Sequence, residues 1–195
     1  MRYFDYVNPN DILDTAKELE MLLTYNEFPT FLYGGTLLGC IRSNDLLPHD
    51  DDIDLFYLSQ QKTLSNVLDE FEEKIRPILE SNGFEIKFVY WKTNGYPQRM
   101  LGQYHIIKND VSIDLWAGWF NTDISLNIIM PIESVIGPKD IIFPSKTGNI
   151  RNYKFNIPNK PELILTYLYG NWTIPNSKYK PLCNTNFLEK INDGE

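Results

Sequence analysis

The chain has 195 residues, of which 43% are hydrophobic, 14% aromatic and 23% charged, and its formal net charge is −8 at pH 7. This length suits one domain over residues 1–195 with a buried core, and the aromatic content argues against disorder. The acidic balance argues against nucleic-acid binding, which usually needs a basic face. Two cysteines form neither a disulfide framework nor a zinc motif. The chain shows no signal peptide and no run of ~18 apolar residues, so we expect a cytoplasmic protein without a membrane span.

The predicted elements alternate between helix and strand before a meander of strands. Asn8 and Pro9 are typical of a helix start. In chain order we expect helix 9–26, strand 30–33, helix 36–42, strand 52–58, helix 62–81, strands 84–91, 100–108, 111–119, 126–130 and 140–144, a strand at about 150–155, and helix 161–169. Asn94-Gly95 and Asn109-Asp110 are expected hairpin turns. This order predicts an α+β fold, a mixed or antiparallel sheet flanked by helices in a single compact domain.

The densest acidic stretch lies at the start of the strand predicted over 52–58. Residues 45–54 contain five aspartates and neither lysine nor arginine. On a strand, Asp52 and Asp54 would point to one face, ~6.6 Å apart. Two carboxylates held ~5 Å apart repel by ~3 kcal/mol at an effective dielectric of ~20, and a divalent cation relieves that repulsion. Oxygen ligands favour Mg²⁺ or Mn²⁺ over zinc. The alternative is a solvated acidic loop, which the adjoining apolar run argues against.

A third carboxylate is available from a later predicted strand. Asp114 interrupts the otherwise apolar run Val111–Trp116. We predict that Asp52, Asp54 and Asp114 form one metal site. Asp114 would then be a metal ligand, the general base for an acceptor hydroxyl, or both. The alternative for Asp114 is a capping carboxylate or a buried acid paired with arginine.

Gly34, Gly35 and Thr36 lead from a predicted strand into a predicted helix. Glycines at such a position let the backbone approach a phosphate, whose charge is favoured by the free N–H groups of the helix start. We therefore expect these three residues to bind substrate, with Arg42 as a bidentate phosphate clamp. The alternatives are an ordinary turn and a surface ion pair between Arg42 and Asp45.

The predicted meander is rich in aromatic residues. Packing of the sheet is the simpler interpretation, and the alternative is a platform for a sugar or for a quaternary ammonium group held by cation–π contact. The residues are Tyr90, Trp91, Tyr96, Tyr104, Trp116 and Trp119.

These motifs also resemble a known family. Gly34-Gly35 followed by Asp52-Ile53-Asp54-Leu55 resembles the nucleotidyltransferase (polymerase β-like) superfamily. The longer pattern GGTLLGCIR and LLPHDDDIDL is similar to the signature of the LicD family, which includes bacterial phosphocholine transferases and the fukutin-type ribitol-phosphate transferases. Phe143-Pro144 and residues 169–172 are similar to later motifs of that family, so the resemblance runs from Gly34 to about Pro175. At His49 the chain departs from the tryptophan that is usual there.

The resemblance implies a nucleotidyltransferase-like fold and a metal-dependent phosphotransferase. Such an enzyme moves a phospho-alcohol from a CDP-activated donor to a hydroxyl of a glycan acceptor and releases CMP. Carried onto this sequence, Asp52 and Asp54 bind Mg²⁺ or Mn²⁺, Asp114 completes the site, and Asp50 assists through water or a second metal. Gly34, Gly35 and Thr36 then line the donor phosphates.

Two other functions stay open at the level of sequence. The first is a nucleotidyltransferase that moves NMP from an NTP to a small acceptor, which differs in the phosphorus that is attacked. The second is an inactive transferase fold kept as a binding module, which the three intact aspartates argue against.

Overall fold

The computed structural model describes residues 8–48, 50, 52–93, 96–122, 125–129, 133–137 and 139–175. It begins with helix α1, Pro9–Tyr25, as predicted. The Asn8 side chain accepts a hydrogen bond from the N–H of Asn10, and Pro9 occupies the first turn, where its missing N–H costs nothing. Five apolar side chains on one side of α1 are fully buried, which fixes the helix on the sheet; they are Ile12, Leu13, Ala16, Leu19 and Leu23.

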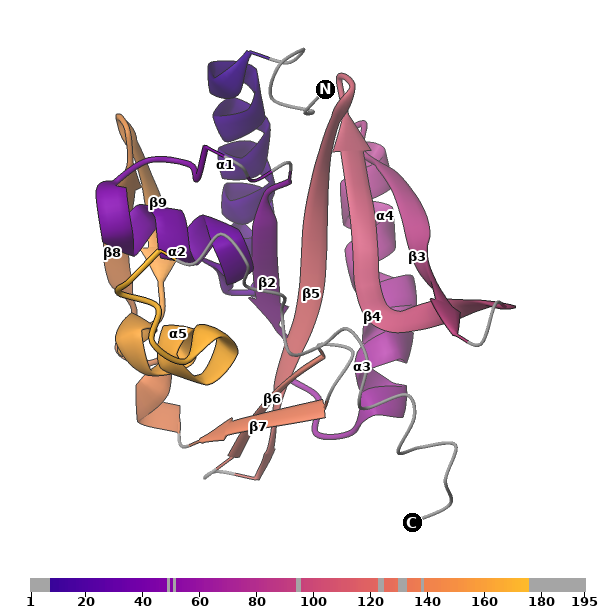
Figure 1. The fold of residues 1–195 in the computed structure, drawn as a ribbon. Helices are drawn as coiled ribbons and strands as arrows, with labels where there is room; N and C mark the ends of the chain where they lie inside the picture. Colours follow the sequence, from indigo (N-terminus) through magenta and orange to yellow (C-terminus); the bar gives the residue numbers. More distant parts are fainter. Residues whose placement is uncertain are drawn as a thin grey trace.

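The central sheet is mixed, as expected (Figure 1). Its strands are β1 (Thr30–Leu32), β2 (Asp54–Leu58), β3 (Glu85–Thr93), β4 (Tyr96–Lys108) and β5 (Val111–Thr122), in the order β1-β2-β5-β4-β3. Strand β6 (Ser125–Ile129) pairs with β5, and β7 (Glu133–Gly137) pairs with β6. The pairing of β2 with β5 is parallel and the other pairings are antiparallel.

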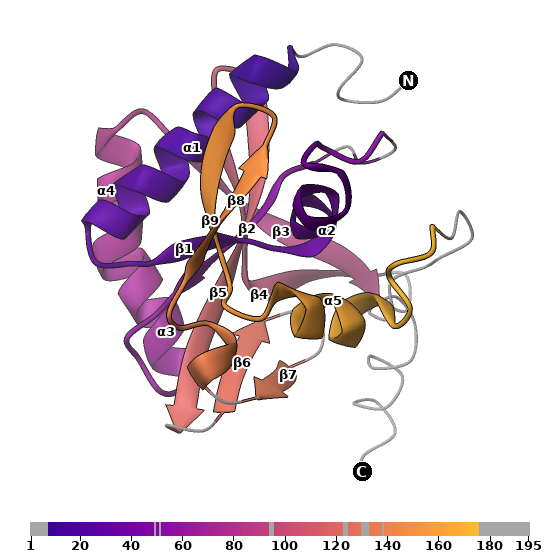
Figure 2. The same cartoon turned by 90° about the vertical axis from the view of Figure 1, so that its left-hand side faces the viewer.

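The two faces of the sheet carry different residues because side chains alternate along each strand. On one face, Leu55, Tyr57, Leu115 and Tyr104 are fully buried. Figure 2 shows α1, α3 (Leu64–Glu70) and α4 (Arg76–Ser81) on one side of the sheet and α2 (Gly34–Ser43) and α5 (Pro161–Tyr169) on the other. The alternate positions of β2 and β5, beginning with Asp54 and Asp114, therefore belong to the face on the α2 side.

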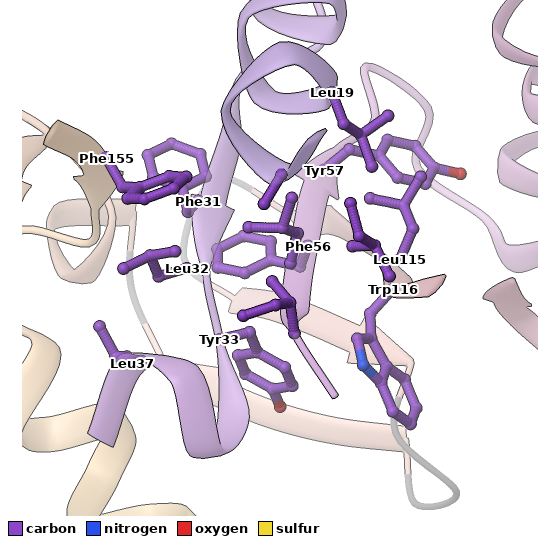
Figure 3. Close-up of a cluster of buried hydrophobic side chains, with 14 of the residues drawn as sticks. Leu19, Phe31, Leu32, Tyr33, Leu37, Phe56, Tyr57, Leu115, Trp116 and Phe155 are labelled. Carbon is purple, nitrogen blue, oxygen red and sulfur yellow. The ribbon is translucent and has the colours of Figure 1, made fainter. Parts of the chain in front are cut away.

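An aromatic core joins α1, β1, β2 and β5, as Figure 3 shows. The rings of Phe31 and Phe56 stack with centroids 5.0 Å apart, and Tyr33 meets Phe56 edge-on at 5.6 Å. Leu19 and Leu115 complete the cluster from α1 and β5. This packing holds the beginning of β2 beside β5, at the point where the acidic residues lie.

The helix predicted over 62–81 is present from Leu64 and is interrupted in its middle. Residues Phe71–Ile75 form a π-helical turn between α3 and α4. Pro77, the second residue of α4, has no N–H to bond to the preceding turn, so the regular helical ladder breaks there. The predicted hairpin turn at Asn109-Asp110 is confirmed, with φ of 50° and 63°. Asn94-Gly95 lies outside the described residues.

The strand predictions differ from the structure at several points. Strand β4 begins at Tyr96 rather than at residue 100, and β7 was not predicted. Strand β2 begins at Asp54 rather than at residue 52. The strand predicted over 140–144 is replaced by a short 3-10 helix, Lys139–Ile141, before a cis Phe143–Pro144 peptide bond. The strand predicted at about 150–155 is two strands, β8 (Lys146–Ile150) and β9 (Tyr153–Ile157), which form a separate hairpin. Its turn places Arg151 at φ 53°, a left-handed conformation that no glycine or proline announces in the sequence.

Helix α5 spans Pro161–Tyr169, as predicted, and ends at Gly170, whose φ is 63°. Throughout the residues that the structure describes, we find no helix with the length and apolarity that a membrane crossing requires.

Candidate active site

Three aspartates come together where β2 starts beside β5. Asp54 and Asp114 are direct partners in the parallel register of β2 and β5, so their side chains lie next to each other on the same face. Asp52 joins them from the loop just before β2. One carboxylate oxygen from each of the three lies within 4.8 Å of the others. The structure therefore brings together the three residues that we predicted as metal ligands. Asp52 reaches the cluster from a loop rather than by strand alternation.

Two donors from different elements fix the Asp54 carboxylate. The N–H of Gly35, at the start of α2, donates to Asp54 Oδ2 at 3.1 Å, and the indole N–H of Trp116 donates to Asp54 Oδ1 at 3.1 Å. The Asp54 backbone N–H donates in turn to the Thr36 hydroxyl at 2.9 Å. Helix α2 and strand β5 thus hold this carboxylate from both sides.

The electrostatics of the cluster favour a cation or a proton. Burial raises the pKa of the Asp54 carboxyl well above its usual range, and the negative charges of Asp52, Asp114 and Asp50 raise that pKa further. The hydrogen bond from Trp116 acts in the opposite direction. The cluster therefore holds more negative charge than the buried position tolerates, unless a positive charge joins it.

Strand β4 supplies two groups that bind Asp114. The side-chain amide of Gln103 donates to Asp114 Oδ2 at 2.9 Å, and His105 Nε2 lies 3.2 Å from Asp114 Oδ1. His105 is the register partner of Asp114, and Lys87 on β3 is the register partner of His105, so these residues form one row across the sheet. Burial and the nearby charge of Lys87 lower the pKa of His105.

Gln103 and His105 on β4 are not among the site residues predicted from the sequence. The available signal was the alternation of polar Gln103 and His105 with buried Tyr104 and Ile106, which places the polar pair on one face. What the sequence does not contain is the register of β4 against β5, which turns that face toward Asp114.

The glycines of the predicted phosphate loop lie directly against carboxylates. A Cβ atom on Gly34, whose φ is 51°, would stand 2.2 Å from Asp54 Oδ2, and a Cβ on Gly35 would stand 2.2 Å from Asp50 Oδ2. These glycines therefore allow α2 to begin in contact with the acidic cluster, and they bring Asp50 to its edge. Thr36 is buried and ties α2 to the beginning of β2.

Arg42 is not brought to the acidic cluster. It lies in the last turn of α2, about 12 Å along the helix axis from Gly34. Its guanidinium donates to the backbone carbonyl of Trp172. Asp45, the predicted alternative partner, instead accepts a hydrogen bond from Arg151 Nε at 2.7 Å. The structure thus connects Arg42 with the segment after α5.

Several residues singled out in the sequence fall elsewhere. His49 and the side chains of Trp91 and Tyr96 lie outside the described residues. Tyr104 and Trp119 are buried, as packing residues would be, and Tyr90 is exposed. Trp116 is buried as well (Figure 3), but its indole N–H belongs to the acidic cluster.

The cluster fits a hard divalent cation. Mg²⁺ and Mn²⁺ bind carboxylate oxygens at about 2.1 Å, so two ligand oxygens on opposite sides of the ion stand ~4.2 Å apart. Neighbouring ligand oxygens around such an ion stand ~3.0 Å apart. The carboxylate oxygens here lie within 4.8 Å of one another, so an ion would draw them closer together. Asp52, Asp54 and Asp114 have the donor chemistry and the spacing to hold such an ion.

Two curated proteins match this chain over stretches of different length. The Rickettsia prowazekii (strain Madrid E) uncharacterized protein RP689 is 34% identical over 58 residues, which cover 29% of this chain and 22% of that protein. The Caenorhabditis elegans uncharacterized protein T07A5.1 is 25% identical over 186 residues, which cover 84% of this chain and 43% of that protein. The chain therefore spans less than half the length of these relatives. Among solved structures, ANT(2")-Ia in complex with adenylyl-2"-tobramycin overlaps 86% of this chain and 80% of its own, with 15% identity and a TM-score of 0.49.

The family model described as LicD/FKTN/FKRP, nucleotidyltransferase domain, matches residues 27–160, well over half of the chain. The match contains the start of α2, the beginning of β2 and Asp114 on β5, and so includes every residue of the acidic cluster. The chain therefore belongs to the LicD/FKTN/FKRP family of nucleotidyltransferase domains.

Proposed function

We propose that this protein is a metal-dependent phosphotransferase. It moves a phospho-alcohol, such as phosphocholine or a polyol phosphate, from a CDP-activated donor to a hydroxyl of a glycan acceptor. Family membership supports a transferase, and the choice of donor and acceptor rests on the motif resemblance at Gly34–Arg42 and Leu46–Leu55.

The observation that carries the proposal is the acidic cluster. Three carboxylates from two segments lie within 4.8 Å of one another, next to a helix start whose glycines contact Asp54 and Asp50. Such a concentration of negative charge destabilises the folded protein when no cation is bound, as the raised pKa of Asp54 indicates. It becomes favourable when it binds Mg²⁺ or Mn²⁺, and such a bound ion would offset the charge of the donor phosphates.

In the proposed reaction, Asp52, Asp54 and Asp114 would hold the metal, and Gly34, Gly35 and Thr36 would line the donor phosphates. The acceptor hydroxyl oxygen attacks the phosphorus that carries the alcohol. A new oxygen–phosphorus bond forms as the bond from that phosphorus to the bridging oxygen breaks, and CMP leaves with the bridging oxygen and its electron pair.

The proton of the acceptor hydroxyl passes to Asp114 in this scheme. Asp114 is the member of the cluster beside His105, whose side chain is 41% exposed, whereas the Asp114 side chain is only 13% exposed. The acceptor is therefore expected to approach Asp114 over β4, on the same face of the sheet as α2. Gln103 and His105 keep the Asp114 carboxylate turned toward that approach.

The test is a turnover assay with a panel of donors. Purified protein is incubated with CDP-choline, CDP-ribitol or CDP-glycerol, with Mg²⁺, Mn²⁺ or EDTA, and a hydroxyl acceptor panel. The expected result is metal-dependent release of CMP from one CDP-alcohol, abolished in Asp52→Asn. Release of pyrophosphate from an NTP would instead establish NMP transfer. If the metal-bound protein neither cleaved nor bound any nucleotide, the proposed enzymatic function would be refuted and a binding module would be favoured.

A further inference from the structure

Two buried, uncharged side chains donate hydrogen bonds to the acidic cluster. Gln103 is 2% exposed and its amide donates to Asp114 Oδ2 at 2.9 Å. Trp116 is 7% exposed and its indole donates to Asp54 Oδ1 at 3.1 Å. Burial of a polar group costs free energy unless the group forms a hydrogen bond. Each of these two side chains donates its hydrogen bond to a predicted metal ligand.

The sheet places the two donors side by side. Gln103 on β4 and Trp116 on β5 are direct partners in the antiparallel register. His105, two residues after Gln103, and Asp114, two residues before Trp116, form the next pair on the same face. Asp54 continues that pair onto β2. One row of the sheet therefore carries the acids, and the adjacent row carries the donors that orient them.

The chemistry of these donors suits a site that binds a cation. A lysine or arginine at position 103 or 116 would neutralise the carboxylates and compete with a metal ion. An amide and an indole fix the rotation of each carboxylate and leave its negative charge in place. A carboxylate oxygen has two lone pairs, so one that accepts such a hydrogen bond can also bind a metal.

We propose that Gln103 and Trp116 are positioning residues that orient Asp114 and Asp54 for metal binding. They act through the two carboxylates and not by contact with the substrate. This inference rests on the metal site of the proposed function, and it names the residues that set the affinity of that site.

The experiment measures Mn²⁺ binding to the full chain by the electron paramagnetic resonance signal of free Mn²⁺. Gln103→Met keeps the length of the side chain and removes the donor, and Trp116→Phe keeps an aromatic ring and removes the indole N–H. Each is expected to weaken Mn²⁺ binding by about 10–100-fold, which is typical of residues that orient metal ligands. Gln103→Lys is expected to weaken it at least as much while leaving the protein without metal as stable as the wild type, or more so.

The matched control lies at the other end of β2. Ser59 is buried there and donates to the buried Glu70 carboxylate, so Ser59→Ala also breaks a buried hydrogen bond to a carboxylate. It is expected to lower the melting temperature and to leave Mn²⁺ affinity within twofold of the wild type. If Gln103→Met and Trp116→Phe behave like Ser59→Ala, the two residues only stabilise the fold and the proposal is overturned.

The positioning role of Gln103 and Trp116 and the proposed function can fail independently of each other. Mn²⁺ binding that weakens in both variants supports the positioning role even if no CDP-alcohol is cleaved, a result that would overturn the donor assignment alone. Cleavage of a CDP-alcohol with unchanged Mn²⁺ affinity in both variants overturns the positioning role alone. A wild-type protein that binds no Mn²⁺ at millimolar concentration overturns both.

Discussion

Replacing Asp52 by asparagine should make the metal-free protein more stable and the metal-treated protein less stable than the wild type. Carboxylate oxygens of Asp52, Asp54 and Asp114 lie within 4.8 Å of one another. Two unit charges at that distance repel by about 3.5 kcal/mol at an effective dielectric of ~20. Asparagine preserves the shape of the side chain and removes one of the charges.

Two effects reduce that figure. Asp52 is partly exposed, so solvent screens its charge, and Asp54 takes up a proton more readily than an ordinary aspartate because its pKa is raised. We therefore expect Asp52→Asn to stabilise the protein in EDTA by about 1–3 kcal/mol at pH 8. For a chain of this size that corresponds to about 2–12 °C in melting temperature.

The stability gained by Asp52→Asn in EDTA should increase with pH. Because the folded-state pKa of Asp54 is raised, its contribution to stability is fully present below the unfolded pKa of ~3.9 and is lost as pH rises through the higher folded value. Asp52 is one cause of that rise, so its removal weakens the dependence. The difference between Asp52→Asn and the wild type should therefore be smaller at pH 5 than at pH 8.

The order of stability should reverse when metal is added. A ligand at 100 times its Kd stabilises a folded protein by about 2.7 kcal/mol, and Asp52→Asn should lose most of that gain. The assay is thermal melting followed by circular dichroism in EDTA and in Mn²⁺, at pH 5 and pH 8. Asp69→Asn, on the exposed surface of α3, serves as control and should change stability by less than ~0.5 kcal/mol. An Asp52→Asn protein that melts below the wild type in EDTA and gains equally from Mn²⁺ would refute the reasoning.

Three further predictions follow from buried positions. Gly34→Ala should lower the free energy of unfolding by more than ~1 kcal/mol and weaken Mn²⁺ binding, because φ is 51° and the new Cβ would meet Asp54. A Mn²⁺ titration that gives the wild-type affinity would contradict this. Burial raises the pKa of Cys40 to about 11, so alkylation of its thiol at pH 8, followed by mass spectrometry, should be about a hundredfold slower than in guanidinium chloride. Tyr104→Phe should leave the melting temperature equal or higher, since the buried hydroxyl has no hydrogen-bond partner among the described residues; a clear decrease would reveal one.

The sequence determined the local structure wherever a segment carries its own signal. The apolar spacing of α1 with its Asn8-Pro9 start, and the turn at Asn109-Asp110, are decided by contacts between residues close in the chain. The sequence failed where the backbone conformation has no such signal. The turn at Arg151 divides β8 from β9 with a left-handed residue that is neither glycine nor asparagine. The start of β2 at Asp54 is likewise set by its pairing with β5.

The candidate site shows the same division. Asp52 and Asp54 were predictable because two acids precede an apolar strand, and Asp114 because it interrupts another. The tertiary structure alone decided that β2 and β5 are parallel neighbours in a register that sets Asp54 beside Asp114. It also decided that Gln103 and Trp116 point at those acids, and that Arg42 lies at the far end of α2. Residue type and spacing specify which groups can bind a metal, whereas strand register, which depends on packing across the whole sheet, specifies which of them meet.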